Sequence, residues 1–132
     1  MLYTLDTNII IDFFHNDEIT VQKIKELEEQ QVSLSISIIT LCELYKGIYL
    51  CKKQELSLNA LTILRQRIET LGVTEESAKI YGQKYAELKA QGKPTQDFDL
   101  IIASTCMANN AVLVTQNAKD FVNIRGLKAV EW

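Results

Sequence analysis

The apolar residues of the chain follow two different periods, which predict short strands alternating with helices. Residues 2–5 form an apolar run that stops at the turn or helix-capping cluster 6–8, and residues 111–115 and 127–130 form similar runs. In residues 32–38, valine, leucine and isoleucine alternate with serine, which is the two-residue period of a β-strand. The sequence therefore predicts strands in these four segments.

The stretches between these strands carry apolar residues three or four positions apart, which is helical spacing. They are residues 9–14, 17–30, 39–50, 56–71, 75–90, 97–110 and, as a short helix, 117–122. Gly92 and Pro94 favour the end of one helix near residue 91. Strands separated by helices need crossover connections, which favour a parallel sheet. We therefore expect one three-layer α/β/α domain over residues 1–132, with a central parallel sheet.

Length and composition fit a single globular domain. The chain has 132 residues, of which 47% are hydrophobic and 23% charged. Its 14 Lys+Arg against 17 Asp+Glu give a net charge of −3, so bulk positive charge does not predict a nucleic-acid partner. No apolar run approaches the ~20 residues of a membrane span, and the start lacks the basic segment of a signal peptide. We expect a cytoplasmic protein without membrane contact, whose cysteines, Cys42, Cys51 and Cys106, are reduced and mostly buried.

Four acidic residues lie where a parallel sheet would gather them. Asp6 directly follows the first strand, and Asp120 follows the strand over 111–115. Glu43 lies in an otherwise apolar helix and Asp99 in the first turn of another. Ligands of such sheets bind beyond the carboxyl ends of the strands, where clustered carboxylates favour a divalent cation. Oxygen ligands alone indicate Mg²⁺ or Mn²⁺, and His15, as the only histidine, argues against zinc.

Each acid taken alone also has a purely structural interpretation. Asp6 could cap the helix that follows it, and Glu43 could pair with Lys46 one turn away on a solvated stripe. An acid such as Asp99 is favourable at a helix N-terminus, and Asp120 could lie in an ordinary surface turn. Only the combination of the four favours a shared site.

Four segments, taken in order, resemble the motifs of the PIN-domain family. They are Leu5-Asp6-Thr7-Asn8, Ile39-Thr40-Leu41-Cys42-Glu43-Leu44 with Lys46-Gly47, Asp99-Leu100-Ile101-Ile102-Ala103, and Leu113-Val114-Thr115-Gln116-Asn117-Ala118-Lys119-Asp120-Phe121. The length, the order and the tail over 126–132 resemble the VapC-type toxins of VapBC toxin–antitoxin pairs. The likeness runs from Leu2 to Trp132.

The resemblance implies a metal-dependent endoribonuclease that hydrolyses RNA phosphodiester bonds. By motif, Asp6, Glu43 and Asp99 would hold Mg²⁺ or Mn²⁺. In many PIN domains a fourth acid stands at the position of Asn117, so here Asp120 is the next candidate for a catalytic acid.

The resemblance also implies supporting residues and partners. Asn8, Asp97, Thr115 and Asn117 would support the acids or position substrate, and Lys46, Lys93 and Lys119 are candidates for phosphate contacts. The partners would be RNA, a cognate antitoxin with a tail near the acidic pocket, and a second copy in a homodimer. Two alternatives stay open, namely a catalytically impaired PIN-like binding module and a receiver or phosphatase-like Mg²⁺-binding domain.

Overall fold

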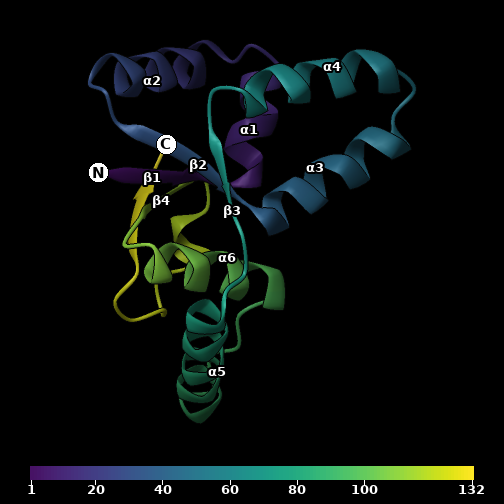
Figure 1. Ribbon diagram of the computed structural model, residues 1–132. Helices are drawn as coiled ribbons and strands as arrows, with labels where there is room; N and C mark the ends of the chain where they lie inside the picture. Colours follow the sequence, from purple (N-terminus) through teal and green to yellow (C-terminus); the bar gives the residue numbers. More distant parts are fainter.

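A five-stranded parallel sheet forms the centre of the computed structural model, which describes residues 1–132 (Figure 1). Its strands are β1 (Leu2–Leu5), β2 (Ser33–Ser37), β3 (Glu69–Leu71), β4 (Val112–Thr115) and β5 (Lys128–Glu131). They lie in the order β3-β2-β1-β4-β5, and every neighbouring pair is parallel. The chain changes direction across the sheet between β1 and β4. Ligands of open α/β sheets bind at the carboxyl ends of strands at such a switch point.

Six helices cover the two faces of this sheet. They are α1 (Thr7–Phe14), α2 (Glu18–Glu29), α3 (Ile38–Leu50), α4 (Gln54–Arg65), α5 (Glu75–Ala90) and α6 (Asp97–Ala108), and a single 3₁₀ turn, η1 (Ala118–Asp120), follows β4. Figure 1 shows α5 and α6 below the sheet, with α1, α2 and α4 above it. The predicted three-layer α/β architecture with a parallel sheet is confirmed.

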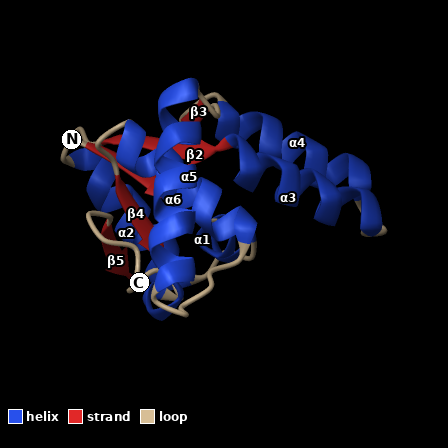
Figure 2. Cartoon of the chain, turned by 90° about the horizontal axis from the view of Figure 1, so that it is seen from below, coloured by secondary structure: helices blue, strands red, loops and turns tan.

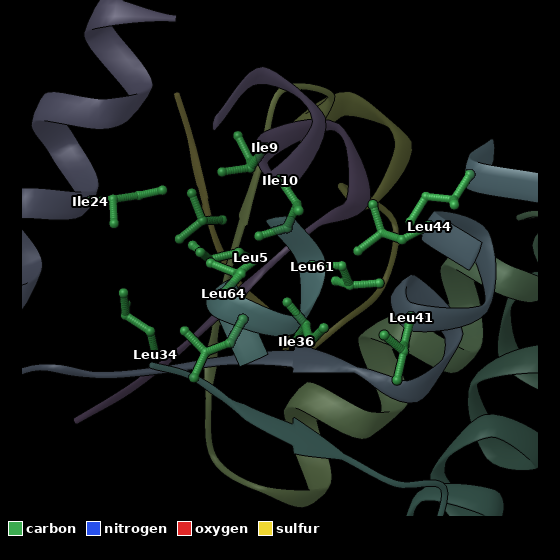
Figure 3. Packing of buried hydrophobic residues seen from close by; sticks show 13 residues of the cluster. Leu5, Ile9, Ile10, Ile24, Leu34, Ile36, Leu41, Leu44, Leu61 and Leu64 are labelled. Carbon is green, nitrogen blue, oxygen red and sulfur yellow. The ribbon is translucent and has the colours of Figure 1, made fainter. Parts of the chain in front are cut away.

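Two hydrophobic cores fill the space between the layers. The first joins α1 to α4 with β1 and β2, and Figure 3 shows its buried side chains around Leu5, Ile36 and Leu61. The second packs α5 and α6 against β4 around Leu100 and Leu113, both 0% exposed. Beyond the sheet, α3 and α4 extend side by side as a projecting pair (Figure 2).

The segment over 56–71 differs from its sequence-based prediction as one helix. The helix α4 ends at Arg65, and residues 69–71 form the edge strand β3, which pairs with β2. Ile68 and Leu71 continue the helical spacing of leucines, yet both are buried against the sheet, at 8% exposure each. Spacing alone does not distinguish these two outcomes, because a three-residue strand is shorter than one helical turn.

The serine side of β2 is also buried, although strict alternation suggests a solvated face. Ser35 is 0% exposed, lies 2.9 Å from the Thr4 hydroxyl and donates to the Tyr3 carbonyl at 3.0 Å. Ser37 is equally buried and caps α3 by accepting from the Thr40 backbone N–H at 3.0 Å. Hydrogen bonding thus satisfies these hydroxyls under the second helical layer.

The cysteines depart from the expectation of mostly buried thiols. All three are free, but Cys42 and Cys51 are exposed and only Cys106 is buried. None of the helices is long and apolar enough to cross a membrane.

Candidate active site

Asp6 occupies the end of β1 and is the most buried of the four predicted acids, at 7% exposure. Its Oδ1 accepts from the Thr7 backbone N–H at 2.9 Å, and its Oδ2 accepts from the Thr115 hydroxyl at 2.8 Å. Burial raises the pKa of Asp6, these hydrogen bonds oppose the rise, and the charges of Glu43 and Asp120 add to it. The capping interpretation of Asp6 is confirmed, since it caps α1, but its second oxygen faces the end of β4.

Glu43 reaches the same place from α3. Its Oε1 accepts from the Thr7 hydroxyl at 2.7 Å, and that hydroxyl also lies 3.1 Å from the buried Thr40 hydroxyl. The alternative ion pair with Lys46 does not form. Thr7 is a contact that sequence reasoning missed, although it stands between Asp6 and Asn8 in the first motif. Thr7, a residue of the first motif, therefore orients Glu43, the acid of the second motif.

Asp99 completes the cluster from the first turn of α6. Partial burial raises its pKa to about 6, and the charges of Asp6, Asp120 and Glu43 add to the rise. Asp120 is exposed in η1, yet its charge raises the pKa of both Asp6 and Asp99. Four carboxylates from four different parts of the chain therefore share one electrostatic site.

No basic side chain neutralises this cluster. The three ion pairs of the molecule, Arg67–Glu28, Lys79–Glu75 and Lys84–Glu87, involve none of the four acids. No group of three His, Cys, Asp or Glu side chains is already arranged to hold a metal ion. Asp6 uses both oxygens, and Glu43 one, in hydrogen bonds within the protein. The donor set fits a hard divalent cation because it consists of oxygen atoms and carries uncompensated negative charge.

The end of β4 supports the cluster through Thr115. Its side chain is completely buried and donates to Asp6, while its Oγ1 accepts from the Asn117 backbone N–H at 3.1 Å. Asn117 itself is exposed at the start of η1. Because β1 and β4 pair in parallel with Leu5 opposite Val114, Asp6 and Thr115 come together directly after that register.

Two further predicted residues lie in different surroundings. Asn8 is on α1, and its Oδ1 is buried without any hydrogen-bond partner. Asp97 begins α6, but its carboxylate accepts from the Tyr81 hydroxyl of α5 at 2.7 Å. Its charge is not among the causes that raise the pKa of Asp6 or Asp99. Asn8 thus holds a buried acceptor without a donor, whereas Asp97 joins two helices.

The three predicted phosphate contacts, Lys46, Lys93 and Lys119, are exposed and form no ion pair. Lys93 lines a hollow of about 290 Å³ between α5 and the start of α6, together with Lys89 and Tyr85. A second groove of about 320 Å³ is lined by apolar residues of α1, α3 and α4 and reaches Glu43. One hollow thus carries lysines near the start of α6, and the other is mainly apolar and ends at an acid of the cluster.

Comparison with known proteins identifies relatives over almost the whole chain. The family model of the PIN domain matches residues 3–127, a span that includes all four acids. Ribonuclease VapC1 of Haemophilus influenzae (strain R2866) is 37% identical over 133 residues, which cover 100% of this chain and 98% of the relative. The tRNA(fMet)-specific endonuclease VapC of Shigella flexneri is 32% identical over 130 residues, or 98% of this chain and 97% of that protein.

A solved structure extends the likeness to the whole fold. In the crystal structure of VapBC2 from Rickettsia felis bound to a DNA fragment from their promoter, one chain has a TM-score of 0.92 and 32% identity to this one. The match covers 100% of this chain and 99% of that chain. The chain therefore belongs to the PIN-domain family and, within it, to the VapC ribonucleases. The predicted resemblance is confirmed, and the receiver or phosphatase-like alternative is wrong.

Proposed function

We propose that this protein is a divalent-metal-dependent endoribonuclease and the toxin of a type II toxin–antitoxin pair. The observation that carries the proposal is the convergence of four acids on one site, namely Asp6, Glu43, Asp99 and Asp120. No Lys or Arg side chain forms an ion pair with any of them. Ribonucleases of this family generally depend on a divalent metal ion. RNA is the substrate class of this activity, and we place the protein with its substrate in the cytoplasm.

The metal-holding residues of the proposed site are Asp6, Glu43 and Asp99, and the ion is Mg²⁺ or Mn²⁺. These two ions prefer oxygen ligands, and the site offers only carboxylates. A bound ion supplies positive charge for the phosphoryl oxygens and lowers the pKa of an attacking water. Asp99, whose pKa is raised to about 6, is mostly ionised at neutral pH, and a bound cation would favour this ionised form further.

The remaining polar residues act on water and substrate. Asp120 is exposed beside the cluster, where it accepts the proton of the attacking water. The buried, unpartnered Oδ1 of Asn8, two residues after Asp6, is an acceptor for a water held inside the protein, since buried acceptors need a donor. Thr115 keeps Asp6 oriented, and Asn117 offers its amide to water or RNA. Attack by water on phosphorus breaks the P–O3′ bond and leaves a 5′-phosphate, and the departing O3′ takes up a proton from solvent to become a 3′-hydroxyl.

The proposed RNA contacts surround the acids. Lys46 follows Glu43 by one helical turn, and Lys119 directly precedes Asp120. Each of these lysines is therefore next to an acid of the site in the sequence. Lys93 lies in the hollow with Lys89 and can hold a phosphate further along the strand. These local charges grip RNA although the net charge of the chain is −3.

The proposed protein partners use apolar surface. The groove between α1, α3 and α4 suits an apolar segment of a cognate antitoxin, and its end at Glu43 brings that segment to the site. VapBC2 from Rickettsia felis, bound to DNA from their promoter, is such a pair in a relative. Exposed Tyr49 and Leu50, at 59% and 80%, suit a homodimer contact at the end of α3, beside this groove.

The test is cleavage of structured RNA, beginning with bulk tRNA, in Mg²⁺, Mn²⁺ or EDTA. We expect cleavage that needs the metal and falls by several orders of magnitude in Asp6→Asn, with Glu55→Gln of α4 as the matched exposed control. Full cleavage in EDTA or in Asp6→Asn would contradict the carboxylate–metal mechanism. Binding of RNA without any cleavage would favour the impaired binding module, for which Asn117 is the motivating departure.

Growth tests separate a toxin from another nuclease. Expression of the wild type should arrest growth, and co-expression of the small open reading frame beside its gene should restore it. Arrest that persists in Asp6→Asn, or a neighbour that neither binds nor rescues, would contradict the toxin role even if RNA is cleaved.

A further inference from the structure

Residues 115–121, termed here the 115–121 segment, carry Asn117 and Asp120 past the acidic cluster. Both residues are exposed, so close packing does not fix their positions. Within the segment, η1 is a single turn closed by the Asp120 N–H on the Asn117 carbonyl at 2.9 Å. Phe121, 3% exposed, packs into the second core at its far end. Contacts from neighbouring elements must therefore place the residues between Thr115 and Phe121.

Two such contacts come from acids that lie outside the cluster. The side-chain amide of Gln116 donates to the Asp12 carboxylate of α1. The Ala118 backbone N–H donates to Oε1 of Glu131, in β5, at 3.1 Å. The two contacts hold the segment from opposite neighbours, a helix on one side and the last strand on the other.

The Gln116–Asp12 contact connects the 115–121 segment to α1, the helix that Asp6 caps. Asp6 caps α1, and Asn8 and Asp12 lie four residues apart on one face of that helix. Through Gln116, the same helix that places Asp6 and Asn8 also fixes the segment that carries Asp120. The Gln116–Asp12 hydrogen bond therefore ties the 115–121 segment to α1 four residues before Asp120.

We propose that Asp12 and Glu131 are positioning residues for RNA hydrolysis, which act by holding Asn117 and Asp120 over the acidic cluster. The proposal rests on the proposed nuclease function. Neither acid is among the charges that raise the pKa of Asp6 or Asp99, so they act through geometry and not through the field of the site. Misplacement of reacting groups by about 1 Å can cost about 100-fold in rate.

The test compares truncating and conservative variants of both residues. Asp12→Ala and Glu131→Ala should lower kcat about tenfold or more, while the KM for RNA changes less than about twofold. Asp12→Asn and Glu131→Gln should keep activity within about threefold, because their amide oxygens still accept the same hydrogen bonds. Gln116→Ala should match Asp12→Ala, and the double variant should be no worse than either single one.

A second measurement needs no cleavage. Amide hydrogen exchange at residues 116–120 should accelerate in Glu131→Ala and Asp12→Ala, and Mn²⁺ affinity should fall because Asp120 moves away from the cluster. If Asp12→Ala fails to fold, Gln116→Ala removes the same bond from the exposed segment. Failure of the wild type to cleave any RNA counts against the proposed function. Amide hydrogen exchange and Mn²⁺ affinity, which need no cleavage, then test the positioning role.

Unchanged kcat and unchanged exchange in both alanine variants would overturn the proposal. A rise in KM with kcat unaffected would also overturn it, because it would make these acids substrate contacts. Loss of activity in Asp12→Asn and Glu131→Gln equal to that of the alanine variants would do the same, since the hydrogen bonds would not be the cause.

Discussion

The Thr7 hydroxyl is the single atom through which α1 holds the acid of α3. It donates to Oε1 of Glu43 at 2.7 Å, and the Glu43 carboxylate makes no other hydrogen bond within the protein. We expect Thr7→Val to lower the cleavage rate about tenfold and to raise the metal concentration needed for half-maximal rate, because Glu43 loses its orientation. Thr7→Ser keeps the hydroxyl and should stay near wild type. A rate in Thr7→Val equal to that of Thr7→Ser would contradict this role.

At pH values above its pKa, ionised Asp99 lowers the stability of the folded state. Its pKa rises from 3.8 when unfolded to about 6 when folded, so between these values the folded state binds more protons. Stability therefore falls as the pH rises through this window and stays lower above it. At about pH 7 in EDTA, Asp99→Asn should raise Tm by about 2–5 °C, and at about pH 4 it should not. Thermal melts check this, and an equal shift at both pH values would contradict it.

The same group links stability to metal. A divalent cation favours ionised Asp99, so Mg²⁺ should raise the Tm of the wild type more at about pH 7 than at about pH 5. Asp99→Asn should lose most of this response, while Glu55→Gln, on the exposed side of α4, should keep it. A metal response that is the same in Asp99→Asn would place the ion elsewhere.

At the scale of elements, the sequence was sufficient where a pattern is local. The apolar residues of α2, α5 and β1 each predict their own element, because the capping residue and the spacing lie within a few residues of one another. The strand β3 was missed because pairing with β2, and not its own three residues, makes it a strand. Motif order predicted that Asp6, Glu43, Asp99 and Asp120 meet, but Asp12 and Gln116 are 104 positions apart and share no local signal.

The proposed RNA contact is tested most directly at Lys93, in the connection between α5 and α6. Binding of RNA to inactive Asp6→Asn should weaken in Lys93→Ala, and the slope of log Kd against log salt should fall by about 0.7 for each phosphate that the variant no longer neutralises. Lys79→Ala is the matched control, since Lys79 lies on α5 but faces Glu75 at 3.9 Å. An equal effect of both substitutions, measured by fluorescence anisotropy, would show that only general charge is involved.

At the scale of the whole molecule, the net charge of −3 says little about RNA binding. Four of the acids share one site that a divalent cation would occupy, so without them the chain is close to balance. Lys46 and Lys119 stand close to Glu43 and Asp120 in the sequence and form no ion pair, and the three ion pairs of the molecule involve none of the four acids. The placement of charge, which composition does not contain, decides whether RNA is attracted to the site.

The apolar groove that ends at Glu43 lets partner binding be tested separately from catalysis. Leu56 lines the apolar groove of α1, α3 and α4 and is 68% exposed, so Leu56→Glu should disrupt an apolar antitoxin segment without disturbing the core. We expect this variant to cleave RNA at the wild-type rate but to escape rescue by the neighbouring reading frame. Ile19→Glu, at a 66% exposed site on α2, is the matched control and should still be rescued. Complex formation by size-exclusion chromatography checks both variants. Wild-type affinity in Leu56→Glu would mean that the antitoxin does not use this groove.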